Sequence, residues 1–187
     1  MKFTDGNWMM RRGVRAYYPA QAYEVAAAQN ALTVQAPAKA IRHRGDTLDG
    51  PLLTVRCSSP VTDVVRIGIT HFAGGPAGDE RLPQFQLSAG HTETSVHLDE
   101  EQAVLTSGRL SVRIARTGGW DLSFLAGGRT LTRSGPRGIG LAEVEGEGQY
   151  LHEQLRLGVG ECVYGLGERF TAFVKNGQVV ETWNKDG

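Results

Sequence analysis

The chain has 187 residues, enough for one domain with a sizeable hydrophobic core. Lys and Arg together number 20 and so do Asp and Glu, which gives a formal net charge of zero. Because no basic cluster is interleaved with aromatic residues, we expect no nucleic-acid partner.

Membrane and secretion signals are not evident in the sequence. The first twenty residues include five charged side chains that interrupt any apolar core of a signal peptide, namely Lys2, Asp5, Arg11, Arg12 and Arg15. No later apolar run reaches the length of a membrane span. The chain has 2 cysteines, Cys57 and Cys162, each in an apolar and strand-like context, whereas a secreted disulfide scaffold would carry more. We therefore expect a cytoplasmic protein with two buried thiols and no membrane partner.

Short apolar stretches separated by glycine predict an all-β fold. In Leu110, Val112 and Ile114, apolar residues alternate with polar ones, which is typical of a strand with one buried and one solvated face. The predicted fold is an antiparallel β-sandwich. In chain order, strands are predicted at residues 23–27, 31–35, 52–58, 64–72, 94–98, 103–106, 110–116, 120–126, 129–134, 140–144, 149–157 and 162–166.

Turns between these stretches suggest how neighbouring strands connect. Gly118-Gly119 and Gly127-Gly128 predict two successive hairpins, and hence a three-stranded meander over residues 110–134. Residues 74–82 read as an exposed polar loop. The alanine-rich stretch 20–30 favours a helix by composition, but its tyrosines and Pro19 fit extended chain equally well, so no long helix is expected.

Catalytic and metal motifs are hard to find. The five histidines are scattered, and no pair of them shares the close spacing with Cys or carboxylate that a zinc site has, so no metal site or cofactor is expected. Gly-x-Gly pairs at 138–140, 158–160 and 165–167 lack the strand-turn-helix context of a nucleotide loop. The carboxylates at 99–101 and at 143, 145 and 147 are expected to lie on solvated surfaces, where acidic residues are usually found.

The C-terminal stretch is the most distinctive part of the sequence. It contains Gly165-Leu-Gly-Glu-Arg-Phe170, an Asn176-Gly177 turn and Trp183-Asn-Lys-Asp-Gly187. Asp186 begins an Asp-Gly turn, where its side chain would either accept its own backbone N–H or present a carboxylate to the hydroxyls of a ligand. The Asp-Gly pair signals a hairpin with no following strand, so the sandwich is expected to lack its last strands.

Two C-terminal strings, YGLGERFT at 164–171 and ETWNKDG at 181–187, carry a family resemblance. They resemble the N-terminal β-sandwich domain of glycoside hydrolase family 31, most closely in its bacterial α-xylosidase branch. The stretches 1–22, 43–48, 51–55 and 108–132 are similar in the same order. The resemblance implies a galactose-mutarotase-like supersandwich over residues 1–187, with the catalytic (β/α)₈ barrel and the C-terminal β-domains of the family absent from this chain.

What this family does sets the functional expectation. The resemblance implies a parent enzyme that hydrolyses terminal α-xylosides with retention, using two barrel carboxylates. No residue of this chain is then catalytic, and the chain alone is predicted to be inactive. Lys185 and Asp186 match the family loop that lines the plus-one sugar subsite.

The implied partners are an α-xyloside or xyloglucan-derived oligosaccharide, the parent's own barrel and, through unpaired sheet edges, further copies in a homo-oligomer. Two alternatives remain open: a free-standing carbohydrate-binding or mutarotase-like module, and α-glucosides as the substrates of the parent enzyme.

Overall fold

The computed structural model describes residues 3–4, 9–48, 50–71, 92–168 and 170–180. Within these ranges no helix is long and apolar enough to cross a membrane, and the helical structure is the short 3₁₀ helix η1 (Arg44–Leu48). The strands are β1 (Val14–Tyr17), β2 (Glu24–Ala28), β3 (Ala31–Pro37), β4 (Leu52–Ser58), β5 (Arg66–His71), β6 (Thr94–Leu98), β7 (Gln102–Ser107), β8 (Leu110–Ala115), β9 (Leu122–Ala126), β10 (Arg129–Ser134), β11 (Ile139–Val144) and β12 (Gly148–Glu153).

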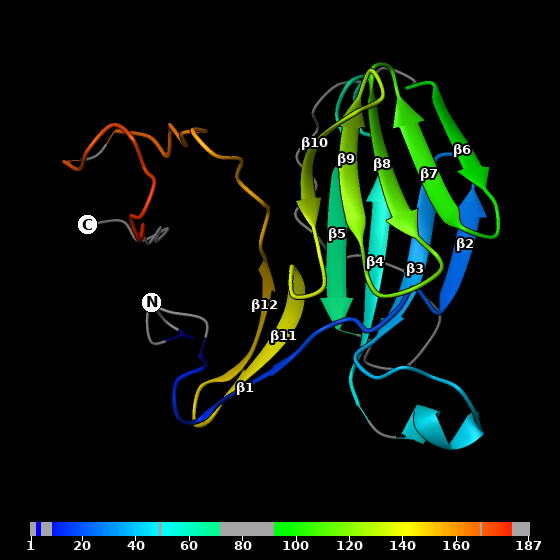
Figure 1. Ribbon diagram of the computed structural model, residues 1–187, viewed down its shortest axis with the longest axis horizontal. Coiled ribbons are helices and arrows are strands. Elements are labelled where there is room, and N and C mark those ends of the chain that lie inside the picture. Colours follow the sequence, from blue (N-terminus) through cyan, green and yellow to red (C-terminus); the bar gives the residue numbers. More distant parts are fainter. Residues whose placement is uncertain (1–2, 5–8, 49, 72–91, 169, 181–187) are drawn as a thin grey trace.

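Two antiparallel sheets form a sandwich. One has the order β2-β3-β4-β5 and the other β10-β9-β8-β7-β6, so strands that follow one another in sequence are hydrogen-bonded neighbours. The two sheets lie face to face in Figure 1. The all-β antiparallel fold predicted from the sequence is confirmed, including the meander over β8, β9 and β10. Gly127 and Gly128 both have positive φ, as a tight two-residue hairpin turn requires.

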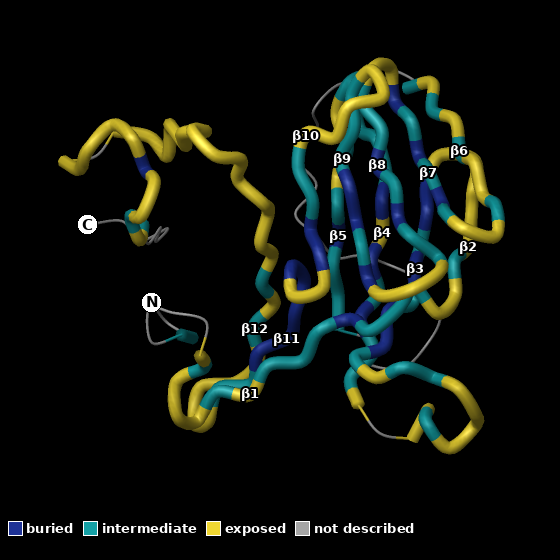
Figure 2. The backbone as a smooth tube through the Cα atoms, viewed as in Figure 1, coloured by how far each residue is buried: buried dark blue, intermediate teal, exposed yellow. Residues whose placement is uncertain are grey.

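The hydrophobic core lies between the two sheets. Alternate residues of β3 and β4, such as Leu32, Val34 and Val55, are excluded from solvent, and Leu105 and Ile114 meet them from the opposite sheet. Burying a side chain of this size stabilises the fold by about 1.5–3 kcal/mol. Figure 2 shows buried stretches along these strands and along β11. The period-2 pattern of the sequence is thus realised as one inward and one outward face.

A third sheet, β1-β11-β12, extends from one side of the sandwich (Figure 1). Its middle strand contributes Ile139 and Leu141 to the same core. β1 was not predicted, because its four residues become a strand only by pairing with β11, from Val14 opposite Val144 to Tyr17 opposite Leu141. The alanine-rich stretch that composition allowed as a helix contains β2 instead, paired along its length with β3.

Beyond β12, the described residues 154–168 and 170–180 have no regular secondary structure. The strand predicted at 149–157 ends at Glu153, and the strand predicted at 162–166 is wrong. Gly160, Gly165, Leu166 and Gly167 all have positive φ, which interrupts the extended backbone that the apolar residues suggested.

The expectation of two buried thiols is correct for one of them only, because Cys57 is buried and Cys162 is exposed. The polar loop predicted at 74–82 lies outside the described residues.

Candidate functional site

Lys185 and Asp186, the two residues expected to bind substrate, lie outside the described residues. The structure does describe most of the segment that leads to them. We call residues 154–180 the C-terminal segment. In Figure 1 it leaves β12 and runs away from the sandwich, and Figure 2 shows that most of it is exposed.

The C-terminal segment is attached to the fold at its first residues. The N–H of Gln154 donates to the carbonyl of Gly138 at 2.8 Å, and the N–H of Arg156 donates to the carbonyl of Arg133 at 3.0 Å. The hydroxyl of Thr132 donates to the carbonyl of Arg156 at 2.7 Å. These bonds extend the pairing of β12 by a few residues and fix the direction in which the segment departs.

Further along, the segment folds back on itself around Asn176. The side-chain oxygen of Asn176 accepts the N–H of Val163 at 2.7 Å, and its amide nitrogen donates to the carbonyl of Glu161 at 2.9 Å. The N–H of Lys175 donates to the carbonyl of Val163 at 2.8 Å. Gly177, with φ of +73°, completes the Asn-Gly turn that the sequence indicated. Asn176 therefore closes a loop whose two arms hold each other in place.

Lys175 adds a second tie inside this loop. Its side chain is buried, and its ammonium donates to the Thr171 hydroxyl at 2.8 Å and to the Ala172 carbonyl at 2.7 Å. The rings of Tyr164 and Phe173 pack with centroids 5.2 Å apart. These contacts hold the segment in a defined conformation, although its described residues form no strand or helix.

Large apolar side chains are exposed along this segment. Phe170 and Val159 are fully exposed, and Phe173 is exposed to 77%. Others with much of their surface open to solvent are Leu155, Leu157, Val163, Tyr164, Leu166, Val174 and Val179. So many exposed apolar groups in one stretch are typical of a surface that another protein part covers.

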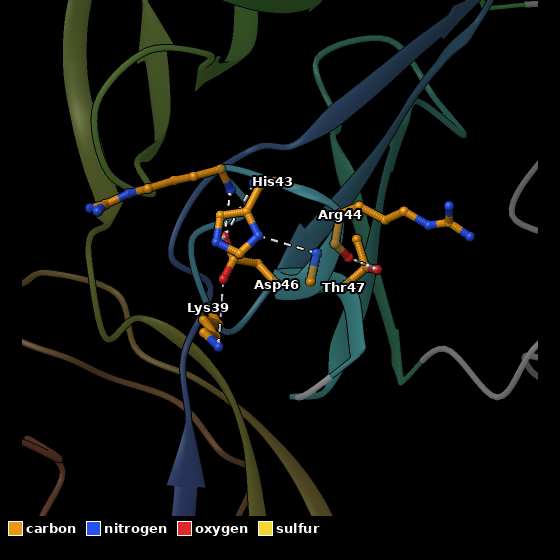
Figure 3. Close-up of polar contacts among 7 residues, drawn as sticks. Lys39, His43, Arg44, Asp46 and Thr47 are labelled. Atoms are coloured by element: carbon orange, nitrogen blue, oxygen red, sulfur yellow. Dashed lines mark hydrogen bonds and ion pairs between the residues drawn. The ribbon is translucent and has the colours of Figure 1, made fainter.

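A second ordered loop surrounds Asp46 in η1 (Figure 3). The N–H groups of Arg42 and His43 donate to its carboxylate at 3.0 and 3.2 Å, and the Lys39 ammonium lies 3.7 Å from it. The hydrogen bond from Arg42 does most to hold the pKa of Asp46 below its ordinary value, and partial burial opposes it. Asp46 therefore shapes the loop of residues 39–47, and a shallow groove of about 190 Å³ separates this loop from β2 and β3.

Other acidic groups are occupied by neighbours. Glu143 accepts hydrogen bonds from Tyr17 at 3.3 Å and from Gln149 at 3.1 Å. Asp99 accepts the N–H groups of Glu101 and Gln102 in the turn between β6 and β7, as expected for that turn. Among the described residues no three His, Cys, Asp or Glu side chains converge as metal ligands would.

Comparison with known families decides which class of domain this is. Residues 54–187 match the glycosyl hydrolase 31 N-terminal galactose mutarotase-like domain. The chain belongs to this family. The family and the galactose-mutarotase-like fold indicated by the C-terminal strings are therefore confirmed.

Individual relatives agree with this assignment. Alpha-xylosidase XylQ of Lactiplantibacillus pentosus is 35% identical over 188 residues, which cover all of this chain and 24% of that protein. An alpha-xylosidase of Emericella nidulans is 35% identical over 210 residues, covering all of this chain and 26% of its own length. The family 31 chain thus spans about a quarter of the length of the curated relatives it matches.

Solved structures share the fold at lower identity. The cycloalternan-forming enzyme of Listeria monocytogenes, solved with a pentasaccharide substrate, superposes with a TM-score of 0.66 at 17% identity, over 93% of this chain and 15% of that chain. A structure of an uncharacterized protein of the same organism, in complex with glucose, magnesium and calcium, superposes over the same shares with a TM-score of 0.65 at 19% identity. At this identity the likeness concerns the fold.

Sequence reasoning found the C-terminal strings but missed two residues that organise the site region. Asn176 belongs to the Asn-Gly turn that the sequence predicts, but its bonds to Glu161 and Val163 depend on tertiary contacts. Asp46 lies in the string 43–48, which resembles the family but by itself predicts no role for this residue. Its hydrogen bonds to backbone N–H groups could have been suspected from the general habit of Asp in loops.

Proposed function

We propose that this family 31 domain is the non-catalytic N-terminal part of an α-xylosidase. In the proposal it packs on the catalytic (β/α)₈ barrel of the same polypeptide and lines the plus-one sugar subsite with Lys185 and Asp186. The names of the two alpha-xylosidase relatives support the substrate class. About three quarters of each relative lies outside the match, which is long enough to contain a catalytic barrel. The low cysteine content supports a cytoplasmic enzyme.

The observation that carries the packing proposal is the row of exposed apolar side chains on the C-terminal segment. Phe170, Phe173 and Val159 contact water over most of their surface. Covering each such side chain would contribute about 1.5–3 kcal/mol. The segment's internal contacts through Asn176 and Lys175 give it a defined shape, which a docking surface needs in order to bind without a large loss of conformational entropy.

The same segment supports the proposed sugar contact, since it continues directly into residues 181–187. Once it docks on the barrel, the next residues would lie at the barrel mouth, where active sites of this architecture are built. A carboxylate at Asp186 would accept hydrogen bonds from hydroxyls of the leaving sugar, and the Lys185 ammonium would donate to them.

The proposed contact is tested by Asp186→Asn in the full-length α-xylosidase. The assay compares a xylosyl disaccharide, which fills the plus-one subsite, with α-xylosyl fluoride, which has no leaving sugar. We expect kcat/KM for the disaccharide to fall by roughly 10- to 100-fold, because a hydrogen bond to a charged group is worth about 1.5–3 kcal/mol. The fluoride should react at the wild-type rate.

Glu147→Gln is the matched control, since Glu147 lies in the exposed turn between β11 and β12. It should leave both substrates unaffected. Equal losses on the disaccharide and the fluoride would show that Asp186 acts on the folding of the site instead of on the leaving sugar. Unchanged kinetics on both would remove Asp186 from the subsite.

The alternatives receive less support. A mutarotase-like module would need a His and a Glu converging on one sugar ring. Within the described residues, His97 and His43 lie beside Asp99 and Asp46, and both ring nitrogens of His152 are buried against β11. Preference for α-glucosides in the parent would depend on the barrel residues that surround the minus-one sugar.

A further inference from the structure

His152 occupies an unusual place for a titratable group. It lies on β12 opposite Gly140 of β11, and its imidazole covers that glycine. A Cβ atom at Gly140 would come within 2.3 Å of the ring nitrogen Nε2, so the missing side chain is what makes room for the ring. The Tyr18 ring packs edge-on against the imidazole, with centroids 5.7 Å apart. The imidazole is thus used as a flat packing group.

Both ring nitrogens of His152 are buried, neither has a hydrogen-bond partner of good geometry among the described residues, and the Gly138 backbone is the polar group that acts on the ring. A neutral imidazole in this position leaves polar atoms poorly paired, and an imidazolium would be a buried charge with no carboxylate paired to it among the described residues, which is more costly. Burial accordingly lowers the pKa of His152, while the nearby carbonyl of Gly138 opposes this effect. The structure favours the uncharged ring.

The charged groups around the ring do little to help a proton bind. On the Tyr18 side, the Arg137 guanidinium lies over the Tyr18 ring at 5.8 Å, and a cation there would repel an imidazolium. Neighbouring Glu153 on β12 points to the opposite face, and partial desolvation raises the pKa of its carboxyl, an effect that Ser134 opposes. On β11, the residue opposite the ring is Gly140, which has no charge. The strand β5 also contacts β12, and its titratable or cationic residues are Arg66 and His71, at its two ends.

We propose that His152 is a pH-sensitive latch that holds β12 and the C-terminal segment against the rest of the fold when neutral and loosens them when protonated. The location supports the conformational role. Gln154 and Arg156, which attach the segment to Gly138 and Arg133, follow His152 within four residues. The inference does not depend on whether Asp186 contacts a sugar.

The direction of the pH effect follows from linkage. The folded chain has a lower His152 pKa than the unfolded chain, whose value is near the ordinary 6.5. The stabilisation is therefore complete above pH 6.5 and is lost as the pH falls from 6.5 through the folded value. Since β12 is an outer strand of the smallest sheet, local opening should precede unfolding of the sandwich.

Hydrogen exchange measured at about pH 7.5 and about pH 5.5, corrected for the intrinsic rate, tests the latch. Protection of β11, β12 and residues 154–156 should fall on acidification by up to about tenfold, the limit that linkage sets about one pH unit below the ordinary pKa of histidine, while β7 and β8 keep theirs. His152→Phe keeps a flat ring but cannot titrate, so its protection should be the same at both pH values.

His97→Gln is the matched control. His97 is exposed on β6, contacts Asp99, and belongs to a different sheet from β12. It should retain the wild-type pH effect on β12. An NMR titration of the wild-type histidines adds an independent readout, with the His152 signal assigned by its loss in the Phe variant. A His152 midpoint at or above the ordinary value, or the same pH effect in His152→Phe, would overturn the proposal.

Discussion

At the scale of single residues, the two cysteines occupy opposite environments. Cys57 is inside the core, where burial raises the pKa of its thiol to about 12. Cys162 is exposed on the C-terminal segment. Both stand in apolar, strand-like stretches of sequence, so local pattern did not separate them. The difference arises because β4 pairs on both sides, whereas the stretch around Cys162 pairs with no strand among the described residues.

Alkylation should distinguish the two thiols. In the native chain we expect one cysteine to react with iodoacetamide, as counted by intact mass, because a thiolate must be accessible in order to attack. Cys162→Ser should abolish the native reaction, and Cys57 should become reactive after denaturation. Fast modification of both thiols in the native chain would contradict the described core, and Cys57→Ser is the complementary control.

Only part of the candidate site could be predicted from the sequence. Lys185 and Asp186 were identified by family resemblance, since sequence chemistry alone left the turn and ligand roles of Asp186 open. Their contact with substrate stays a prediction. The structural supports of the same region, such as the two hydrogen bonds of the Asn176 side chain, join residues 13 and 15 positions apart. No local pattern specifies such pairs.

At the scale of secondary-structure elements, strands were predicted best where their own sequence carries the signal. The bounds of β4, β6 and β10 agree with the predicted ranges 52–58, 94–98 and 129–134. β1 was missed and a strand at 162–166 was wrongly predicted, because a strand needs a partner as well as suitable residues. Residues 14–17 have that partner in β11, more than a hundred residues away.

The turn between β7 and β8 offers a prediction at the same scale. Gly108 has φ of +55°, and a Cβ atom there would lie 2.4 Å from the Asp63 carboxylate. That carboxylate accepts the N–H of Arg109 at 2.5 Å and so ties the β4–β5 connection to this turn. Gly108→Ala should therefore lower the free energy of unfolding by about 1–3 kcal/mol, through strained backbone and a displaced Asp63.

Gly118→Ala is the control for this substitution. Gly118 also has positive φ, at +77°, but apart from its two chain neighbours no atom in the described part of the chain lies within 4 Å of its added Cβ. Gly118→Ala should lower the free energy of unfolding only through the strain of an alanine in the left-handed backbone conformation, by about 1–2 kcal/mol. Urea unfolding of both variants makes the comparison. Equal destabilisation would mean that the contact with Asp63 carries no energy.

At the scale of the whole molecule, the sandwich buries its apolar side chains, whereas the C-terminal segment exposes them. The sandwich closes around a continuous core to which all three described sheets contribute, as a stable domain requires. The C-terminal segment, by contrast, leaves large apolar side chains in water. Composition could not reveal this division, since apolar residues are spread along the chain. It becomes visible only when the buried and exposed positions are known.

The central proposal is that this family 31 domain completes an α-xylosidase by docking its C-terminal segment on the catalytic barrel. The most direct test is release of xylose from an α-xyloside by the purified 187-residue chain, alone and mixed with an α-xylosidase from which the matching N-terminal domain has been deleted. We predict no release by the chain alone and restored hydrolysis in the mixture. Sustained release by the chain alone would contradict the account, and so would a mixture in which the chain neither binds nor restores the deleted enzyme.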